Sequence, residues 1–347
     1  MNERVKMELS KLQQSIINAP CNRSVVISSA ASGKTKILTE KVRQILRAGV
    51  NPRDIAVITF TNMAAAELRQ RLGDDYKEGL FVGTVHALAN YMLCMGGVST
   101  KKVLNEEKFD ELFELIKENP SCVRHLEWIL LDEAQDSDKS QFQFLFEMIK
   151  PDCFFVVGDP KQMIYSFRGS DSTLMMRLGN TPGARIFDMN ENYRNGKEIL
   201  GFAKRLIRPT GLIDTSIPMC NYLGEVEEIP YNSSTILQLV KEGQYGDWAI
   251  LTRTNQEIAD IGTLLKKEKI PFDTFKQGDL SKDELNTKMN QNTVKVLTVH
   301  SAKGLEFLNV IVVGARYYNA EERNVCYVAA TRAKNRLIWM GTSKKRK

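Results

Sequence analysis

The chain has 347 residues, of which 43% are hydrophobic and 26% charged, and its formal net charge is +6 at pH 7. This length and composition fit two domains with ordinary buried cores, and so modest a charge does not by itself indicate nucleic-acid binding. Six cysteines without a C-x-x-C pair and three scattered histidines argue against a disulfide framework and a zinc site. The charged first residues and the lack of a long apolar run predict a soluble, cytoplasmic protein without a membrane partner.

Along the first half of the chain, short apolar runs alternate with amphipathic stretches of helical length. Strands are expected at Val25–Ser28, Ile55–Phe60, Phe81–Thr84, Trp128–Asp132, Phe154–Gly158 and Ala184–Met189. Helices are expected at Lys34–Ala48, Asn62–Leu72 and Lys139–Ile149, with a mainly helical insertion over residues 88–127. This alternation predicts a mostly parallel sheet with helices on both faces.

The pattern begins again after about residue 182. Strands are expected at Val226–Pro230, Trp248–Thr252, Val294–Thr298, Val310–Gly314 and Leu337–Met340. Helices are expected at Gly196–Ile207, Asn255–Lys267 and Glu321–Ala333, and Asp273–Asn292 reads as a polar loop of little periodicity. We therefore predict an α/β protein of two domains, residues 1–181 and 182–347.

Two motifs of the first half point to phosphate chemistry. Residues 28–35, SSAASGKT, follow an apolar run and precede a helix, so backbone N–H groups, the Lys34 amine and the Thr35 hydroxyl can face phosphates and Mg²⁺. The apolar run 128–131 ends at Asp132 and Glu133, a pair suited to holding a metal ion and orienting a water. Taken alone, the first motif could be a simple turn of small residues, and the second could be a solvated acidic turn.

A third motif joins two kinds of ligand contact. Residues 156–169, VVGDPKQMIYSFRG, place the Gln162 amide just after a strand, with Tyr165, Phe167 and Arg168 close behind. Aromatic rings and guanidinium planes stack on single-stranded bases, for roughly 1–3 kcal/mol per base. A segment that touches a nucleotide and a nucleic-acid strand can couple the two. Burial of the aromatic rings in a core is the alternative.

Further motifs follow in a fixed order. They are TFTNMAAAELRQRL (59–72), GTVHALA (83–89), LLDEAQD (130–136), ENYRN (191–195), TVHSAKGLEF (298–307) and YVAATRA (327–333). Together with the motifs above, the set resembles the UvrD/Rep family of superfamily 1 DNA helicases from Gln13 to Ala333. The resemblance implies two RecA-like P-loop NTPase domains that bind ATP and Mg²⁺.

The resemblance also implies roles for individual residues at the nucleotide. Catalysis falls to Lys34, Asp132, Glu133, Gln162, Arg194 and Arg332, of which the two arginines reach the γ-phosphate as arginine fingers. Mg²⁺ is held by Thr35 and Asp132. Binding of ATP involves Gln13 on the adenine, Tyr193 stacked on it, and Glu306 on the ribose. The phosphate loop supplies Ser28, Ser29, Ala30, Ala31, Ser32, Gly33, Lys34, Thr35 and Lys36.

The residues that match the family's single-strand groove form a second set. In the first domain they are Phe60, Thr61, Asn62, Thr84, His86, Tyr165, Phe167 and Arg168. In the second domain they are Thr298, His300 and Ser301. The implied partner is single-stranded DNA or a junction between single strand and duplex. RNA is a weaker alternative, since no feature of the sequence indicates recognition of a 2′-hydroxyl.

The chain departs from the family in its length. The large accessory insertions are reduced to residues 88–127 and to the loop at 273–292, and no segment after Met340 has the length of the family's strand-separating hairpin. An ATP-dependent single-stranded DNA translocase or helicase of 3′-to-5′ polarity is the main expectation. The alternative is a nucleotide-gated clamp on single-stranded DNA, or a subunit that depends on a nuclease, replication or repair partner.

Overall fold

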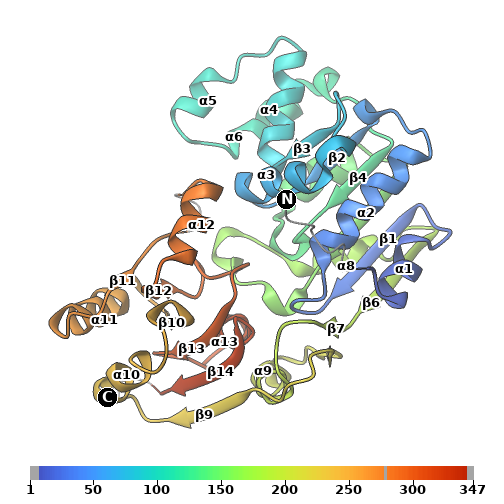
Figure 1. The fold of residues 1–347 in the computed structure, drawn as a ribbon. Coiled ribbons are helices and arrows are strands. Elements are labelled where there is room, and N and C mark those ends of the chain that lie inside the picture. Colours follow the sequence, from blue (N-terminus) through green and yellow to red (C-terminus); the bar gives the residue numbers. More distant parts are fainter. Residues whose placement is uncertain (1–7, 277–279, 342–347) are drawn as a thin grey trace. The chain divides into compact units, whose positions relative to one another are not determined.

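The computed structural model describes residues 8–276 and 280–341, and its contacts divide the chain into two compact units. The first unit contains the chain up to Ser28, Gly33–Asp159 and Phe167–Met189. The second contains Ser29–Ser32, Pro160–Ser166 and the chain from Asn190 onward. Each unit is an α/β layer structure around one six-stranded parallel sheet, as the sequence predicted (Figure 1).

The sheet of the first unit has the strand order β3-β2-β4-β5-β1-β6. Its strands are β1 (Arg23–Ser28), β2 (Ile55–Ile58), β3 (Phe81–Gly83), β4 (Trp128–Leu131), β5 (Cys153–Gly158) and β6 (Ala184–Met189). All six predicted strands are present, with ends shifted by at most two residues. Because β6 pairs with β1, this sheet extends beyond residue 181, where the predicted domain boundary lies.

The strands of this sheet read as unbroken apolar runs because both faces are covered. Alternate side chains enter two separate cores: Ala56 and Ile58 belong to one and Ile55 and Val57 to the other. The covering helices are α1 (Lys11–Ile17), α2 (Lys34–Arg47), α3 (Asn62–Leu72), α4 (Val85–Met95), α5 (Lys101–Asn105), α6 (Glu111–Glu118), α7 (Lys139–Phe142) and α8 (Ser172–Leu178). The predicted helix Lys139–Ile149 continues from α7 as a π-helical turn, Gln143–Met148.

The sheet of the second unit has the order β11-β12-β10-β13-β14-β9. Its strands are β9 (Glu225–Ile229), β10 (Trp248–Thr252), β11 (Phe272–Asp273), β12 (Val294–Thr298), β13 (Phe307–Val312) and β14 (Ala333–Met340). A separate two-stranded parallel sheet pairs β7 (Glu191–Asn192) with β8 (Ile217–Pro218). The helices are α9 (Lys197–Ile207), α10 (Ser233–Val240), α11 (Asn255–Lys267), α12 (Lys282–Asn290) and α13 (Ala320–Ala330).

Helix α12 corrects the prediction of a structureless polar loop over Asp273–Asn292. Its start carries a capping box, in which the Ser281 hydroxyl accepts from the Glu284 N–H and the Glu284 carboxylate accepts from the Ser281 N–H. Leu285 is its single buried side chain, so the helix leaves almost no hydrophobic period in the sequence. The S-x-x-E spacing was the available signal.

Over the described residues, no helix is both long and apolar enough to cross a membrane.

Candidate nucleotide and nucleic-acid sites

In the first unit, the end of the phosphate motif is built around a glycine that no other residue can replace freely. Gly33 precedes α2 with φ of +89°, and a Cβ there would lie 2.8 Å from Nε2 of Gln13. Gln13 is itself fixed in α1, since its side chain accepts from the Ser10 N–H in a capping box. The predicted adenine-reading amide therefore lies against the start of the 14-residue helix α2, whose free N–H groups favour an anion.

The acidic pair directly follows β4, and it faces the start of α2. Thr35 Oγ1 lies 3.5 Å from Asp132 Oδ2, and Lys34 Nζ lies 4.0 Å from Glu133 Oε1. Burial, and then the charge of Glu133, raise the pKa of Asp132 to about 7, against the opposing charge of Lys34. In these four residues, the carboxyl-edge cluster, the charge of Lys34 therefore does not offset the cost of ionising the buried Asp132 carboxyl group.

The donor set of this cluster fits a magnesium ion that shares its coordination with phosphate. A carboxylate and a hydroxyl are the oxygen ligands that Mg²⁺ takes, usually together with water and substrate phosphates. Within the described ranges, no group of three or more His, Cys, Asp or Glu side chains lies close enough to hold a metal alone. Asp132 and Thr35 are thus the residues that would hold the ion.

Gln135 is a further residue of this site to which the sequence analysis gave no role. It is fully buried, and its Nε2 donates to Glu133 Oε2 at 2.6 Å. Its Oε1 accepts from the N–H of Asp159, the residue after β5, at 2.9 Å. Gln135 therefore fixes the Glu133 carboxylate, whose own backbone has a left-handed φ of +50°. The amide two residues after the acidic pair was the signal in the sequence.

In the second unit, Ser29–Ser32 are fastened by the ENYRN motif. Asn192 Nδ2 donates to the Ala30 carbonyl at 2.9 Å, and the Tyr193 N–H donates to the Ala31 carbonyl at 3.1 Å. Ala31 adopts a φ of +55°, a conformation that costs a residue with a Cβ roughly 1–2 kcal/mol. Ala31 thus introduces local strain, while the short side chains of the loop keep its backbone accessible.

Gln162 and Arg332, both predicted to contact the γ-phosphate, lie together in the second unit. Arg332 Nη2 donates to Gln162 Oε1 at 3.3 Å, and both side chains are at least 97% buried. The same guanidinium donates through Nε to the Val328 carbonyl at 3.0 Å and through Nη1 to the Leu305 carbonyl at 3.2 Å. Arg332 therefore has a structural role in addition to any catalytic one.

Arg194 and Glu306 are paired with each other. Arg194 Nε lies 2.7 Å from Glu306 Oε2, and Lys334 Nζ lies 2.6 Å from Glu306 Oε1. Burial acts to raise the pKa of Glu306, but the two positive charges outweigh it and hold that pKa below its ordinary value. The Tyr193 side chain is 45% exposed, and its hydroxyl donates to Glu191 at 2.9 Å. Its ring is thus accessible for stacking.

The predicted nucleic-acid residues of the first unit fall into two groups. Thr61 and Thr84 are N-caps, whose hydroxyls accept from the N–H groups of Ala64 and Ala87 at 3.1 and 3.2 Å. Asn62 is the first residue of α3 and exposed, whereas Phe60 just before it is half-buried. These caps place the two threonines where the first free N–H groups of α3 and α4 begin.

The other group consists of His86, Phe167 and Arg168. The His86 ring packs 5.0 Å from the Phe113 ring, and its Nε2 lies 3.1 Å from Asp110 Oδ1, so this side chain contacts the helical insertion. Phe167 is 64% exposed, with the Arg168 guanidinium 5.6 Å from its ring centre. The aromatic and guanidinium surfaces thus form one exposed stacking element.

The predicted nucleic-acid residues of the second unit lie around one loop. The Tyr165 ring is 5.8 Å from the His300 ring, and the Thr298 hydroxyl donates to that of Ser301 at 3.0 Å. Burial, and then the charge of Arg253, lower the pKa of His300. His300 is therefore held neutral in this setting, and its Nε2 donates to the Ile164 carbonyl at 3.1 Å.

Two side chains that the sequence analysis did not single out hold the same loop. Lys303 Nζ donates to the Gln162 carbonyl and Asn324 Nδ2 donates to the Met163 carbonyl, both at 3.0 Å. With His300 on Ile164, three consecutive carbonyls are bonded to three side chains of the second unit. The loop that carries Gln162 and Tyr165 is thereby fixed to helix α13 and to the segment after β12.

The sequence profile of the UvrD/REP helicase N-terminal domain matches residues 9–121 and 108–182, which is half of the chain. The profile of the UvrD-like helicase C-terminal domain matches residues 274–344.

Three curated relatives illustrate the similarity. ATP-dependent DNA helicase Rep of Escherichia coli is 24% identical over 370 positions, which cover 77% of this chain and 55% of Rep. DNA helicase II of Haemophilus influenzae is 22% identical over 368 positions, which cover 76% of this chain and 51% of the relative. The Gabija protein GajB of Bacillus cereus is 25% identical over 466 positions, which cover 92% of this chain and 93% of GajB. The chain therefore spans about half the length of the first two relatives but nearly all of the third.

Proposed function

The chain belongs to the UvrD/Rep helicase family, and we propose that it is an ATP-dependent translocase and helicase acting on single-stranded DNA with 3′-to-5′ polarity. The observation that carries this proposal is the carboxyl-edge cluster of Lys34, Thr35, Asp132 and Glu133. Its two carboxyl groups and one hydroxyl, together with the Lys34 amine and the free N–H groups at the start of α2, suit a magnesium–nucleotide complex.

The chemistry follows from the side chains of this cluster. Lys34 binds the outer phosphates of ATP, and Thr35 and Asp132 would hold a magnesium ion, which would supply charge neutralisation at those phosphates. Glu133, oriented by Gln135, accepts a proton from the attacking water. The water oxygen bonds to the γ-phosphorus as the bond to the bridging oxygen breaks, which yields ADP and phosphate.

Residues of the second unit complete the nucleotide contacts in this proposal. Tyr193 stacks on the adenine, and Gln162 and Arg332 contact the γ-phosphate as a pair. For Arg194 to reach the γ-phosphate, its ion pair with Glu306 must open, and the released Glu306 is then able to accept from the ribose hydroxyl. Binding of ATP is thus an exchange of one set of ion pairs for another.

The link between ATP and DNA lies in the loop that follows β5. Gln162 faces the nucleotide, while Tyr165 contacts DNA bases beside His300. Because the loop carbonyls are bonded to Lys303, Asn324 and His300, Gln162 and Tyr165 are held in one rigid loop, which can relay a change at the nucleotide to the DNA contact. An intracellular location and a nuclease, replication or repair protein as partner remain predictions.

Phe167→Ala tests this coupling. We expect basal ATP hydrolysis to be retained, because Phe167 is exposed and lies outside the carboxyl-edge cluster. The stimulation by single-stranded DNA should fall, because the loss of one stacked base weakens binding by roughly 1–3 kcal/mol. The measurement is ATP hydrolysis against the concentration of an oligonucleotide, with Tyr76→Ala, an exposed aromatic residue outside both predicted sites, as the control. Equal stimulation of the unmodified chain and the Phe167→Ala variant would remove the coupling role from Phe167.

Translocation itself is tested by the displacement of streptavidin from biotinylated single-stranded DNA. Movement from 3′ to 5′ predicts ATP-dependent displacement from a 5′-biotin and little from a 3′-biotin. Displacement from the 3′-biotin alone would contradict the polarity. DNA binding that tightens with ATP, without displacement at either end, would favour the nucleotide-gated clamp.

A further inference from the structure

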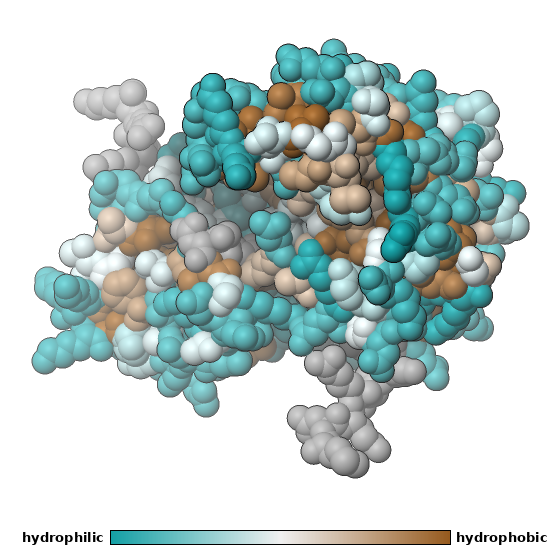
Figure 2. Space-filling model, turned by 90° about the horizontal axis from the view of Figure 1, so that it is seen from above, coloured by the Kyte–Doolittle hydropathy of each residue, from teal (hydrophilic) through white to brown (hydrophobic). Residues whose placement is uncertain are grey.

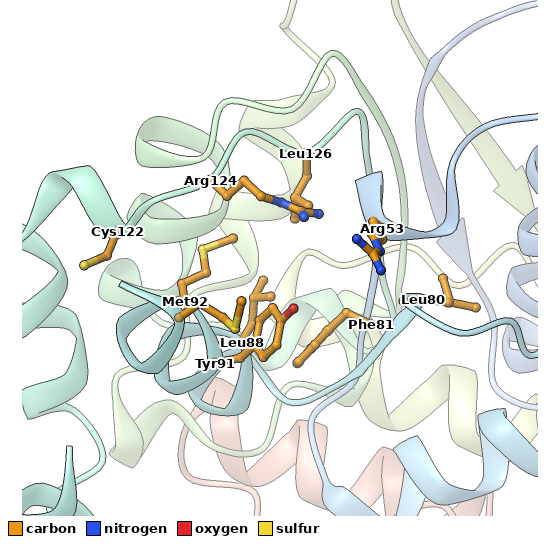
Figure 3. A pocket seen from close by; sticks show the side chains of 11 residues that line it. Arg53, Leu80, Phe81, Leu88, Tyr91, Met92, Cys122, Arg124 and Leu126 are labelled. Carbon is orange, nitrogen blue, oxygen red and sulfur yellow. The ribbon is translucent and has the colours of Figure 1, made fainter. Parts of the chain in front are cut away.

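A pocket of about 230 Å³ opens in the first unit, at the edge of the sheet where the strands begin (Figure 3). Its inner wall consists of Leu88 and Met92 of α4, Phe81 of β3 and Leu126, which precedes β4. Asp132 follows the other end of β4, so the carboxyl-edge cluster lies at the opposite edge of the same sheet. The pocket is therefore separate from the candidate nucleotide site.

Two arginines give the pocket a positive rim. Figure 3 shows the side chains of Arg53 and Arg124 on one side of the pocket, with Phe81 and Tyr91 on the other. Arg124 has one ion pair, at 3.6 Å to Asp54, and within residues 8–276 and 280–341 the Arg53 guanidinium has no hydrogen-bond or ion-pair partner. The lining contains two guanidinium groups and no carboxylate.

The mouth of the pocket has an apolar surface that the first unit does not cover. Tyr91 and Met95, one turn apart on α4, are 47% and 73% exposed. Figure 2 looks onto the α4–α6 side of this unit, where brown apolar residues interrupt the hydrophilic surface. Methionine is unbranched and polarizable, so Met95 and Met92 adapt readily to an inserted side chain.

We propose that this pocket binds an acidic peptide segment of another protein through one large apolar side chain. The apolar side chain enters between α4 and β3, and neighbouring carboxylates pair with Arg53 and Arg124. The volume lies below the roughly 300–1,000 Å³ of small-molecule sites, which suits a single inserted side chain. A nucleic-acid backbone requires an extended basic surface, whereas here Asp54 accompanies the two arginines. This inference does not depend on the proposed function.

Selection from a phage-displayed library of random dodecapeptides against the full chain provides the probe. Enriched peptides should combine a phenylalanine, tryptophan or leucine with neighbouring aspartate or glutamate residues. The strongest is then labelled with fluorescein and titrated by fluorescence anisotropy. Arg124→Glu and Met95→Asp should each weaken its binding about tenfold or more, since each sets a carboxylate against the acidic peptide. Replacement of its apolar residue by serine should have a similar effect.

Two exposed positions outside the pocket provide matched controls. Arg185→Glu and Met219→Asp make the same charge changes and should leave peptide binding unaltered, and all four variants should keep the ATP hydrolysis of the unmodified chain. The proposal is overturned if no peptide is enriched, if the enriched peptides lack acidic residues, or if Arg124→Glu and Met95→Asp bind them as well as the controls do. Displacement of the peptide by a single-stranded oligonucleotide would instead assign the pocket to nucleic acid.

Discussion

Lys34→Ala is expected to lower the turnover number for ATP hydrolysis by about 10²–10³-fold, the usual effect of removing one donor to a developing anionic charge. Lys34 is the cationic side chain that faces Glu133 and Asp132 in the carboxyl-edge cluster. Without the Lys34 amine, less positive charge offsets the repulsion between the phosphates of ATP and the carboxylates of Asp132 and Glu133. Nucleotide affinity should fall together with turnover. The measurement is the steady-state release of phosphate at saturating ATP and single-stranded DNA.

The matched control for this substitution is Lys102→Ala. Lys102 is exposed on α5, outside the carboxyl-edge cluster, so its removal should leave turnover unchanged. Thermal unfolding shows whether either variant has lost its fold. A folded Lys34→Ala protein that hydrolyses ATP at half the normal rate or more would exclude Lys34 from the phosphate site.

Arg332→Lys has the second largest expected effect. Lysine keeps the positive charge but loses the planar fork, and arginine fingers contribute about 10³–10⁵ to turnover in related chemistry. In this chain the fork also binds Gln162 and the carbonyls of Val328 and Leu305, which a single ammonium group cannot replace together. We therefore expect turnover to fall at least about 10²-fold, together with a loss of stability of about 1–3 kcal/mol from unpaired buried groups.

The two effects of Arg332→Lys are separable. Urea unfolding measures the stability, and titration with a fluorescent ATP analogue measures nucleotide binding, which should change much less than turnover. Arg208→Lys, at an exposed arginine after α9, should alter neither. Full turnover in a destabilised Arg332→Lys protein would show that Arg332 is a structural residue alone.

The elements that carry the nucleotide site were predictable because their signals are local. A buried parallel strand is an unbroken apolar run, so the ends of β1, β4 and β5, and therefore the motif loops after them, could be read from the sequence. Helix α12 was not predicted because its one buried residue, Leu285, creates no hydrophobic periodicity in the sequence. Pairing with β13 and β9 similarly extends β14 back to Ala333, through polar residues that gave no strand signal.

The contacts among the predicted site residues could not be predicted from the sequence. Arg194 and Glu306 are 112 residues apart, and neither position indicates that they neutralise each other. The division of the phosphate motif, with Ser29–Ser32 in the second unit and Gly33 in the first, also arises from long-range contacts, such as that of Asn192 with Ala30. The pocket under α4 combines three separate segments of chain, and only Leu88 among its lining residues belongs to a recognised motif.

The most direct test of the proposed function is the rate of ATP hydrolysis by the purified chain with and without single-stranded DNA, with Lys34→Ala measured in parallel. A DNA-dependent ATPase predicts slow hydrolysis alone, a severalfold increase with single-stranded DNA, and loss of both rates in the variant. Three results would contradict the proposed function: a rate of ATP hydrolysis that does not change with DNA, a rate that is unchanged in the Lys34→Ala variant, or no hydrolysis under either condition.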